Sequence, residues 1–142
     1  VAIINDGFIQ QVGNPYDIYH KPKNKFVADF IGLGVFLPIK KINNEDFEIP
    51  LGILDNDKIK DDLSKYKNAE ILVRPDDIIH NDSSNLKAVV TEKQFRGAEF
   101  LYKLLYNDEY PLLCYAPSHH NHEIGEPIGI ELDMEHYVIF EK

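Results

Sequence analysis

The chain of 142 residues is long enough to form one domain with its own hydrophobic core and a short additional segment. Its net charge of −9 is concentrated after residue 32, where 12 basic and 21 acidic residues occur, and such an acidic surface repels nucleic-acid phosphates and anionic lipid headgroups. The single cysteine, Cys114, excludes an internal disulfide framework and fits a reducing cytoplasm, and no apolar run is long enough to span a membrane.

The first twelve residues predict a β-hairpin. An apolar segment, residues 1–4, is followed by Asp6-Gly7 and then by the partly alternating segment 8–12. Asp-Gly supplies the pair of positive φ angles that a tight two-residue turn requires. We therefore expect two paired antiparallel strands at the start of the chain.

Two short helices are predicted after the hairpin. Asn14 has the side chain of a helix N-cap and is followed by a proline, so a helix is expected over residues 15–20, before Pro22. Asn24 begins a second helix with apolar residues at helical spacing. We expect this helix to end at Gly32 in the left-handed conformation.

From residue 33 onward the apolar pattern has a period of two, which predicts β-strands. Turn residues separate the strands about every ten positions, and this spacing is typical of a small antiparallel barrel. Over residues 55–66 apolar residues recur at three- and four-residue spacing, which predicts one short helix, while the polar composition of the segment leaves a mobile loop as the alternative. The predicted strands are 35–39, 47–50, 69–73, 86–94, 100–106, 110–115 and 138–140.

Several segments in this order resemble one protein family. Residues 7–32 resemble the last stretch of the nucleotide-binding domain of importer-type ABC transporter ATPases of the maltose, polyamine and ferric-iron group. Downstream, the later segments are similar to the TOBE type of OB-fold regulatory domain. These segments are Arg74-Pro75-Asp76, Phe95-Arg96-Gly97, residues 125–128 and residues 138–140.

The resemblance implies a mainly β protein with two parts. Residues 1–32 correspond to a C-terminal remnant of the ATPase domain, a hairpin with two short helices, and residues 33–142 to the TOBE/OB-fold barrel. In the family this domain regulates the ATPase and contacts its counterpart in a homodimer, at the cytoplasmic face of a membrane with permease subunits. Residues 35–38 look most like the ferric-iron branch, while polyamine, sulfate and sugar branches stay open.

The chain lacks the sequences that ATP hydrolysis requires. No glycine is followed by lysine, so there is no phosphate-binding loop, and no apolar strand ends in paired acids for magnesium. We therefore expect no catalysis and no cofactor here, with ATP and Mg²⁺ belonging to the intact parent. The apolar residues of the first part should then be buried against a second copy of the chain. We expect a homodimer that forms through the barrel or through residues 1–32 as an N-terminal arm.

The Arg74-Pro75-Asp76-Asp77 segment is the main candidate for a special role. Proline fixes a turn at a strand end, and arginine can pair with an acid, so a barrel corner held by a partly buried ion pair is expected. The alternative is an oxyanion pocket built from Arg74, Arg96 and the amide of Gly97. The excess of acidic residues in this part of the chain weakens that alternative.

A histidine-rich segment, residues 119–123, is the candidate for metal binding. His119, His120, His122 and a glutamate lie within five positions, and imidazole is a ligand of zinc, nickel and copper. Protein metal sites usually take their ligands from separate elements, whereas these lie in one polar loop. We therefore expect a solvated loop and no metal site.

Overall fold

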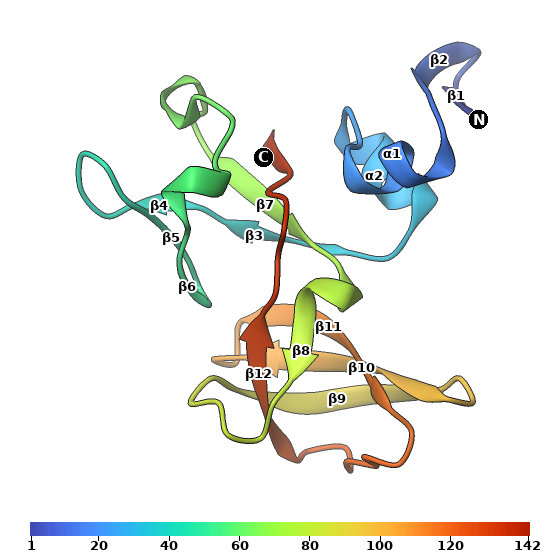
Figure 1. The fold of residues 1–142 in the computed structure, drawn as a ribbon, viewed down its shortest axis with the longest axis vertical. Coiled ribbons are helices and arrows are strands. Elements are labelled where there is room, and N and C mark those ends of the chain that lie inside the picture. Colours follow the sequence, from blue (N-terminus) through green and yellow to red (C-terminus); the bar gives the residue numbers. More distant parts are fainter.

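The computed structural model describes residues 1–142 and is mainly β (Figure 1). It begins with the hairpin of β1 (Ala2–Asn5) and β2 (Phe8–Val12), whose turn has φ angles of 51° at Asp6 and 80° at Gly7. The predicted hairpin is thus confirmed, with a register shift between Ile3 and Ile4. No helix of the structure combines the length and the apolar character needed to cross a membrane.

Both predicted helices form, at α1 (Pro15–His20) and α2 (Lys25–Ile31). The side chains of Asn14 and Asn24 accept hydrogen bonds from backbone amides in the first turns, at 2.8 and 2.9 Å. The prediction for Gly32 is wrong, because its φ of −177° is extended rather than left-handed. Glycine matters there for space, since an added Cβ would lie 3.1 Å from the Tyr19 ring.

The remaining strands form three antiparallel sheets. The first has the order β13-β7-β3, with β3 (Val35–Pro38), β7 (Ala69–Val73) and β13 (Ile139–Glu141). The second is a small sheet of β4 (Lys40–Lys41), β5 (Phe47–Ile49) and β6 (Gly52–Ile53). The third has the order β11-β10-β9-β12-β8, with β8 (Ile78–His80), β9 (Lys87–Phe95), β10 (Glu99–Tyr106), β11 (Tyr110–Pro117) and β12 (Pro127–Leu132).

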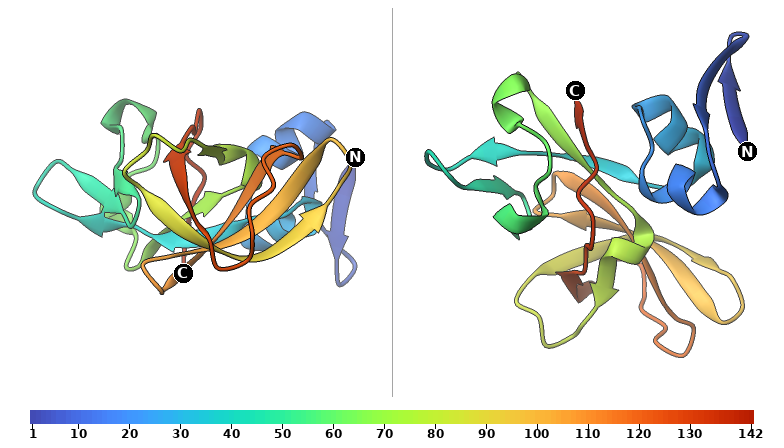
Figure 2. Two further views of the ribbon diagram at one scale, coloured as in Figure 1. Left: turned by 90° about the horizontal axis from the view of Figure 1, so that it is seen from below. Right: turned by 45° about the horizontal axis from the view of Figure 1, so that its top comes forward.

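The five-stranded sheet curls into a nearly closed barrel, as Figure 2 shows, so the predicted fold class is confirmed. Its two outer strands, β8 and β11, approach each other, and the Cys114 thiol donates to the Ile78 carbonyl across this seam at 3.4 Å. Cys114 is fully buried, and burial raises the pKa of its thiol to about 12. The thiol is therefore a neutral part of the core.

The helix predicted over residues 55–66 does not form. The segment instead contains two 3₁₀ turns, η1 (Asn56–Lys58) and η2 (Leu63–Lys65). Asp55 and Asp62 each accept a hydrogen bond from the amide two residues ahead, at 3.0 and 3.1 Å. Such local side-chain bonds offer the backbone an alternative to a continuous helix.

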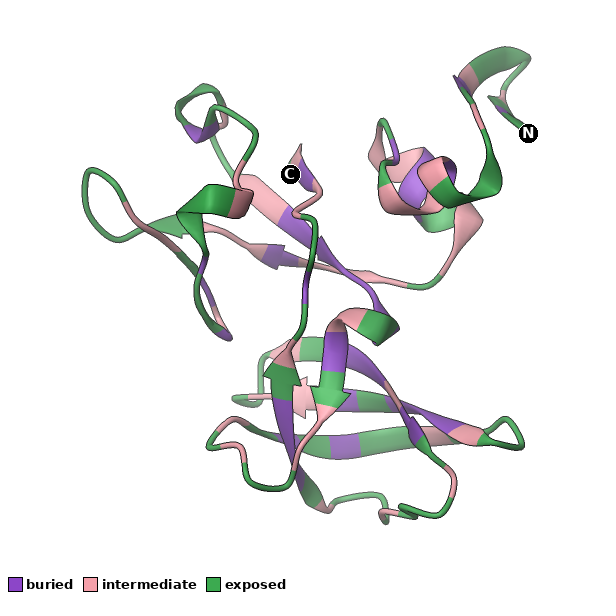
Figure 3. Cartoon of the chain, viewed as in Figure 1, coloured by how far each residue is buried: buried purple, intermediate pink, exposed green.

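The chain has two separate hydrophobic clusters. The larger contains 20 buried residues between Leu37 and Ile139, and the smaller consists of Ile3, Ile18 and Val27 in the N-terminal part. Figure 3 shows the hairpin as mostly exposed. Phe8 and Ile9 on its second strand are 74% and 65% exposed. The division into residues 1–32 and 33–142 stays a prediction, and the separate clusters agree with it.

Candidate functional site

Arg74 lies beside the N-terminal helices, at the link between the β13-β7-β3 sheet and the barrel strand β8. It follows β7 directly and precedes the turn η3 (Pro75–Asp77), which leads into β8. The turn is closed by the Asp77 carboxylate, which accepts a hydrogen bond from the Arg74 amide at 2.9 Å. Pro75 suits this place because it has no amide hydrogen to satisfy. The sequence prediction of a fixed turn at this strand end is confirmed.

The guanidinium of Arg74 bonds to backbone carbonyls instead of an acid. Its Nη1 donates to Leu33 O at 2.9 Å, and its Nη2 donates to Tyr19 O and Ala28 O at 3.3 Å each. Arg74 is only 4% exposed and forms no salt bridge, so the predicted ion pair is wrong. Two of the three acceptors belong to the last turns of α1 and α2, whose carbonyls lack helical partners and carry partial negative charge.

Tyr19 completes this junction. The Arg74 guanidinium stacks over the Tyr19 ring, with its carbon 4.2 Å from the ring centroid. The Tyr19 hydroxyl donates to the Asp76 carboxylate at 2.9 Å. Burial, together with the hydrogen bond to Asp76 and its charge, raises the pKa of the Tyr19 phenol. Through Tyr19, Arg74 and Asp76 therefore hold α1 against the link between β7 and β8, and the Tyr19 phenol stays neutral.

A cleft of about 250 Å³ adjoins the junction, and its walls are acidic. Such a field disfavours an anion, and the Arg74 guanidinium already has three carbonyl acceptors. The carboxylates that line the cleft are Asp76, Asp77, Asp133 and Glu135.

Asp77 should make the stability of this junction depend on pH. Burial raises the pKa of its carboxyl to about 6, with only partial compensation from the hydrogen bond of the Arg74 amide. The pKa of the Asp77 carboxyl is higher in the folded chain than in the unfolded chain. Its contribution to the free energy of unfolding is therefore complete below about pH 4 and is lost as the pH rises through about 6. Asp77→Asn keeps the acceptor oxygen but cannot ionise. We expect the variant to gain stability relative to the wild type between about pH 4 and 7 in urea unfolding, whereas a constant difference would contradict the buried carboxyl.

Arg96 and Gly97 lie in a different environment, at the turn between β9 and β10. Arg96 is exposed and donates to the Tyr115 hydroxyl and the Gln94 side-chain oxygen, both at 3.3 Å. Gly97 has a φ of 78°, so glycine is needed there for the backbone conformation. Arg96 and Arg74 share no hydrogen-bond partner, and the structure does not bring together the groups of the oxyanion pocket.

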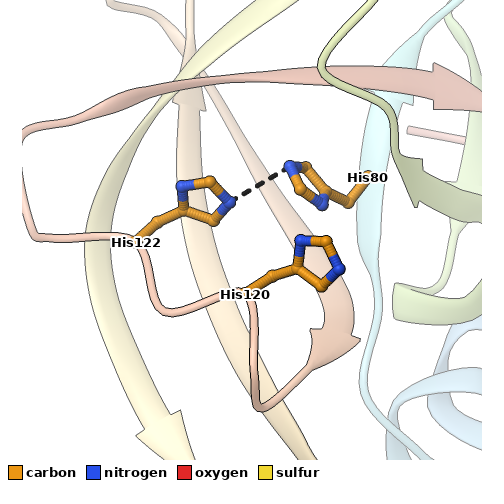
Figure 4. Close-up of side chains that lie close together, drawn as sticks. All are labelled: His80, His120 and His122. Atoms are coloured by element: carbon orange, nitrogen blue, oxygen red, sulfur yellow. Dashed lines mark hydrogen bonds between the residues drawn. The ribbon is translucent and has the colours of Figure 1, made fainter.

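The histidines assemble differently from the prediction. His120 and His122, in the loop between β11 and β12, meet His80 at the end of β8 (Figure 4), with their ligand atoms within 4.8 Å of one another. His119 is not part of this cluster. The expectation of a fully solvated loop is wrong for His122, whose side chain is 15% exposed. Sequence reasoning missed His80 because only the barrel topology brings β8 beside the loop.

Comparison with known proteins points to one family. Residues 71–140 match the family model described as "TOBE domain". The whole chain aligns, at 32% identity over 151 residues, with the "Spermidine/putrescine import ATP-binding protein PotA" of Clostridioides difficile (strain 630), and spans 40% of that protein's length. This relative does not confirm the ferric-iron branch. The chain is therefore similar over its whole length to part of one importer ATP-binding protein, and its residues 71–140 are similar to a TOBE domain.

Proposed function

We propose that this chain is the regulatory part of an ABC importer ATP-binding subunit that serves polyamine uptake, and that it is not itself catalytic. The observation that carries the proposal is the alignment of the whole chain with an ATP-binding protein whose name specifies spermidine and putrescine. The alignment includes the N-terminal helices as well as the barrel. Ferric iron, sulfate and sugars are the alternative imported substrates.

The Arg74 junction supports a regulatory role because it joins two parts of the chain. One guanidinium bonds to α1, to α2 and to the segment before β3, while the backbone of the same residue links β7 to η3. A displacement of the helices would therefore strain these hydrogen bonds next to β7 and η3. In an intact subunit, ATP and Mg²⁺ would be held outside these residues, at the cytoplasmic face of a membrane with permease subunits.

Uptake measurements test the proposed substrate class. A strain that lacks the gene for this protein should lose uptake of labelled spermidine and putrescine, and the restored gene should recover it. Ferric-iron and maltose uptake in the same strain serve as controls and should not change. Loss of iron uptake with normal polyamine uptake would assign the protein to the ferric-iron branch instead.

The exposed apolar hairpin should take part in pairing with a second copy. Phe8 is 74% exposed on β2, and an open strand edge with apolar side chains is a template for association. We expect a homodimer by light scattering, and Phe8→Asp should shift it toward the monomer. Ile53→Asp, at a position 71% exposed on the distant β6, is the matched control and should leave the dimer unchanged.

The alternatives are separated by the same measurement. A dimer that survives Phe8→Asp would place the contact on the barrel. A wild-type chain that is monomeric at high micromolar concentration would contradict a dimerisation role.

A further inference from the structure

We propose that His80, His120 and His122 form a binding site for a divalent transition-metal ion of the zinc type. The three imidazoles come from two elements, the strand β8 and the loop before β12. This removes the reason for expecting a plain solvated loop, which was that all the ligands lay in one segment. Figure 4 shows the His122 and His80 rings pointing at each other, with His120 beside them.

The distances between the rings are close to those of a tetrahedral site. The Nε2 atoms of His80 and His122 are 3.1 Å apart. Two nitrogens each about 2.0–2.1 Å from one tetrahedral zinc ion are separated by about 3.4 Å, so these rings need only a small adjustment. His120 is exposed, and its ring can rotate toward the other two. A fourth position remains for water or a carboxylate.

Two carboxylates support the imidazoles. Oε1 of Glu126 lies 3.2 Å from Nδ1 of His122, which places the ring proton on Nδ1 and leaves Nε2 free as a ligand. Oδ1 of Asp82 lies 2.7 Å from Nε2 of His80, the atom that faces the cluster. When His80 shifts its proton to Nδ1, its Nε2 can bind the ion and Asp82 becomes available as an oxygen ligand. The two negative charges offset the charge of the cation.

The loop that carries two of the ligands is tied to the barrel core. Tyr102 of β10 is fully buried, and its hydroxyl donates to the His120 carbonyl at 2.8 Å and accepts from the His122 amide at 3.0 Å. The Lys93 ammonium donates to the His122 carbonyl at 3.1 Å. His80 is fixed from the other side, because β8 pairs with β12 at Ile130. The site is therefore largely formed before any ion binds.

The donor set selects a class of ion. Neutral imidazole nitrogens suit zinc, copper, nickel and cobalt, whereas magnesium and calcium require sites built from oxygen ligands. Zinc is the appropriate probe because three histidines with one open position match its tetrahedral preference. Cobalt(II) is a spectroscopic substitute, since its absorption reports tetrahedral coordination.

The experiment is a zinc titration of the full chain by calorimetry after treatment with a chelator. We expect one ion per chain, no binding of magnesium, and tetrahedral absorption bands with cobalt. His80→Ala and His120→Ala should each lower the zinc affinity at least tenfold. His119→Ala, in the same loop but outside the cluster, is the matched control and should change the affinity less than twofold. Glu126→Gln should lower the affinity about 10- to 100-fold by releasing the His122 ring.

The His120→Ala variant tests the site even if His80→Ala does not fold. His120 is exposed, so His120→Ala should leave the unfolding midpoint of the metal-free chain unchanged. Unchanged zinc affinity in a folded His120→Ala variant would overturn the three-histidine site. The same conclusion follows if the wild type shows no saturable binding, or if His119→Ala loses as much affinity as His120→Ala.

Discussion

Arg74→Ala is expected to lower the free energy of unfolding by roughly 2–5 kcal/mol, because the change removes a buried cation with several hydrogen bonds. Three backbone carbonyls, of Leu33, Tyr19 and Ala28, lose their donor, and the Tyr19 ring loses the group stacked on it. Urea unfolding followed by circular dichroism measures the effect. The N-terminal helices should also become more sensitive to protease, since Arg74 holds the last turns of both.

Two control variants make this prediction specific to the junction. Arg96→Ala also removes an arginine from the chain, but that side chain is exposed, so we expect a change within about 0.5 kcal/mol. Arg74→Lys keeps the charge but lacks the planar guanidinium that bonds to several acceptors at once. Its loss of unfolding free energy should therefore lie between those of Arg96→Ala and Arg74→Ala. Equal unfolding midpoints for Arg74→Ala and Arg96→Ala would refute the junction.

The elements that sequence alone predicted are those decided by local chemistry. Asp6-Gly7 determines a turn through φ, and Asn14 and Asn24 begin helices by accepting amide hydrogens three residues ahead. The strands follow because alternating burial leaves a period of two in the sequence. Asp55 shows the limit of this reasoning, since its local cap prevailed over a weak helical pattern.

The groups that sequence reasoning placed wrongly are those whose partners lie far along the chain. Arg74 was expected to pair with an acid, but its guanidinium bonds to carbonyls 41 to 55 residues away. Gly32 was expected to end a helix through its φ, but the close approach of Tyr19 explains the glycine. The sequence around His80 contains no metal-ligand motif, and its contact with His122 depends on the pairing of β8 with β12.

Gly129→Ala should be among the most damaging single-methyl changes in the barrel. Gly129 is buried in β12, and an added Cβ would lie 2.1 Å from the carbonyl oxygen of Asn81 and 3.0 Å from Cα of Asp82. These are backbone atoms, so no side chain can rotate away to make room. The segment after β8 would have to move, which breaks the hydrogen bond from the Asn81 amide to the Gly129 carbonyl, 2.9 Å long.

We expect Gly129→Ala to lower the free energy of unfolding by about 3 kcal/mol, the upper part of the range for an added methyl in a packed interior. Gly13→Ala is the control, because its Cβ would meet only the Ile18 side chain, at 3.7 Å, and the change should be nearly neutral. Equal stability of the two variants in urea unfolding would show that β12 and the segment after β8 do not pack this closely. Because the displaced segment carries Asp82 and adjoins His80, a folded Gly129→Ala variant should also bind zinc more weakly than Gly13→Ala does.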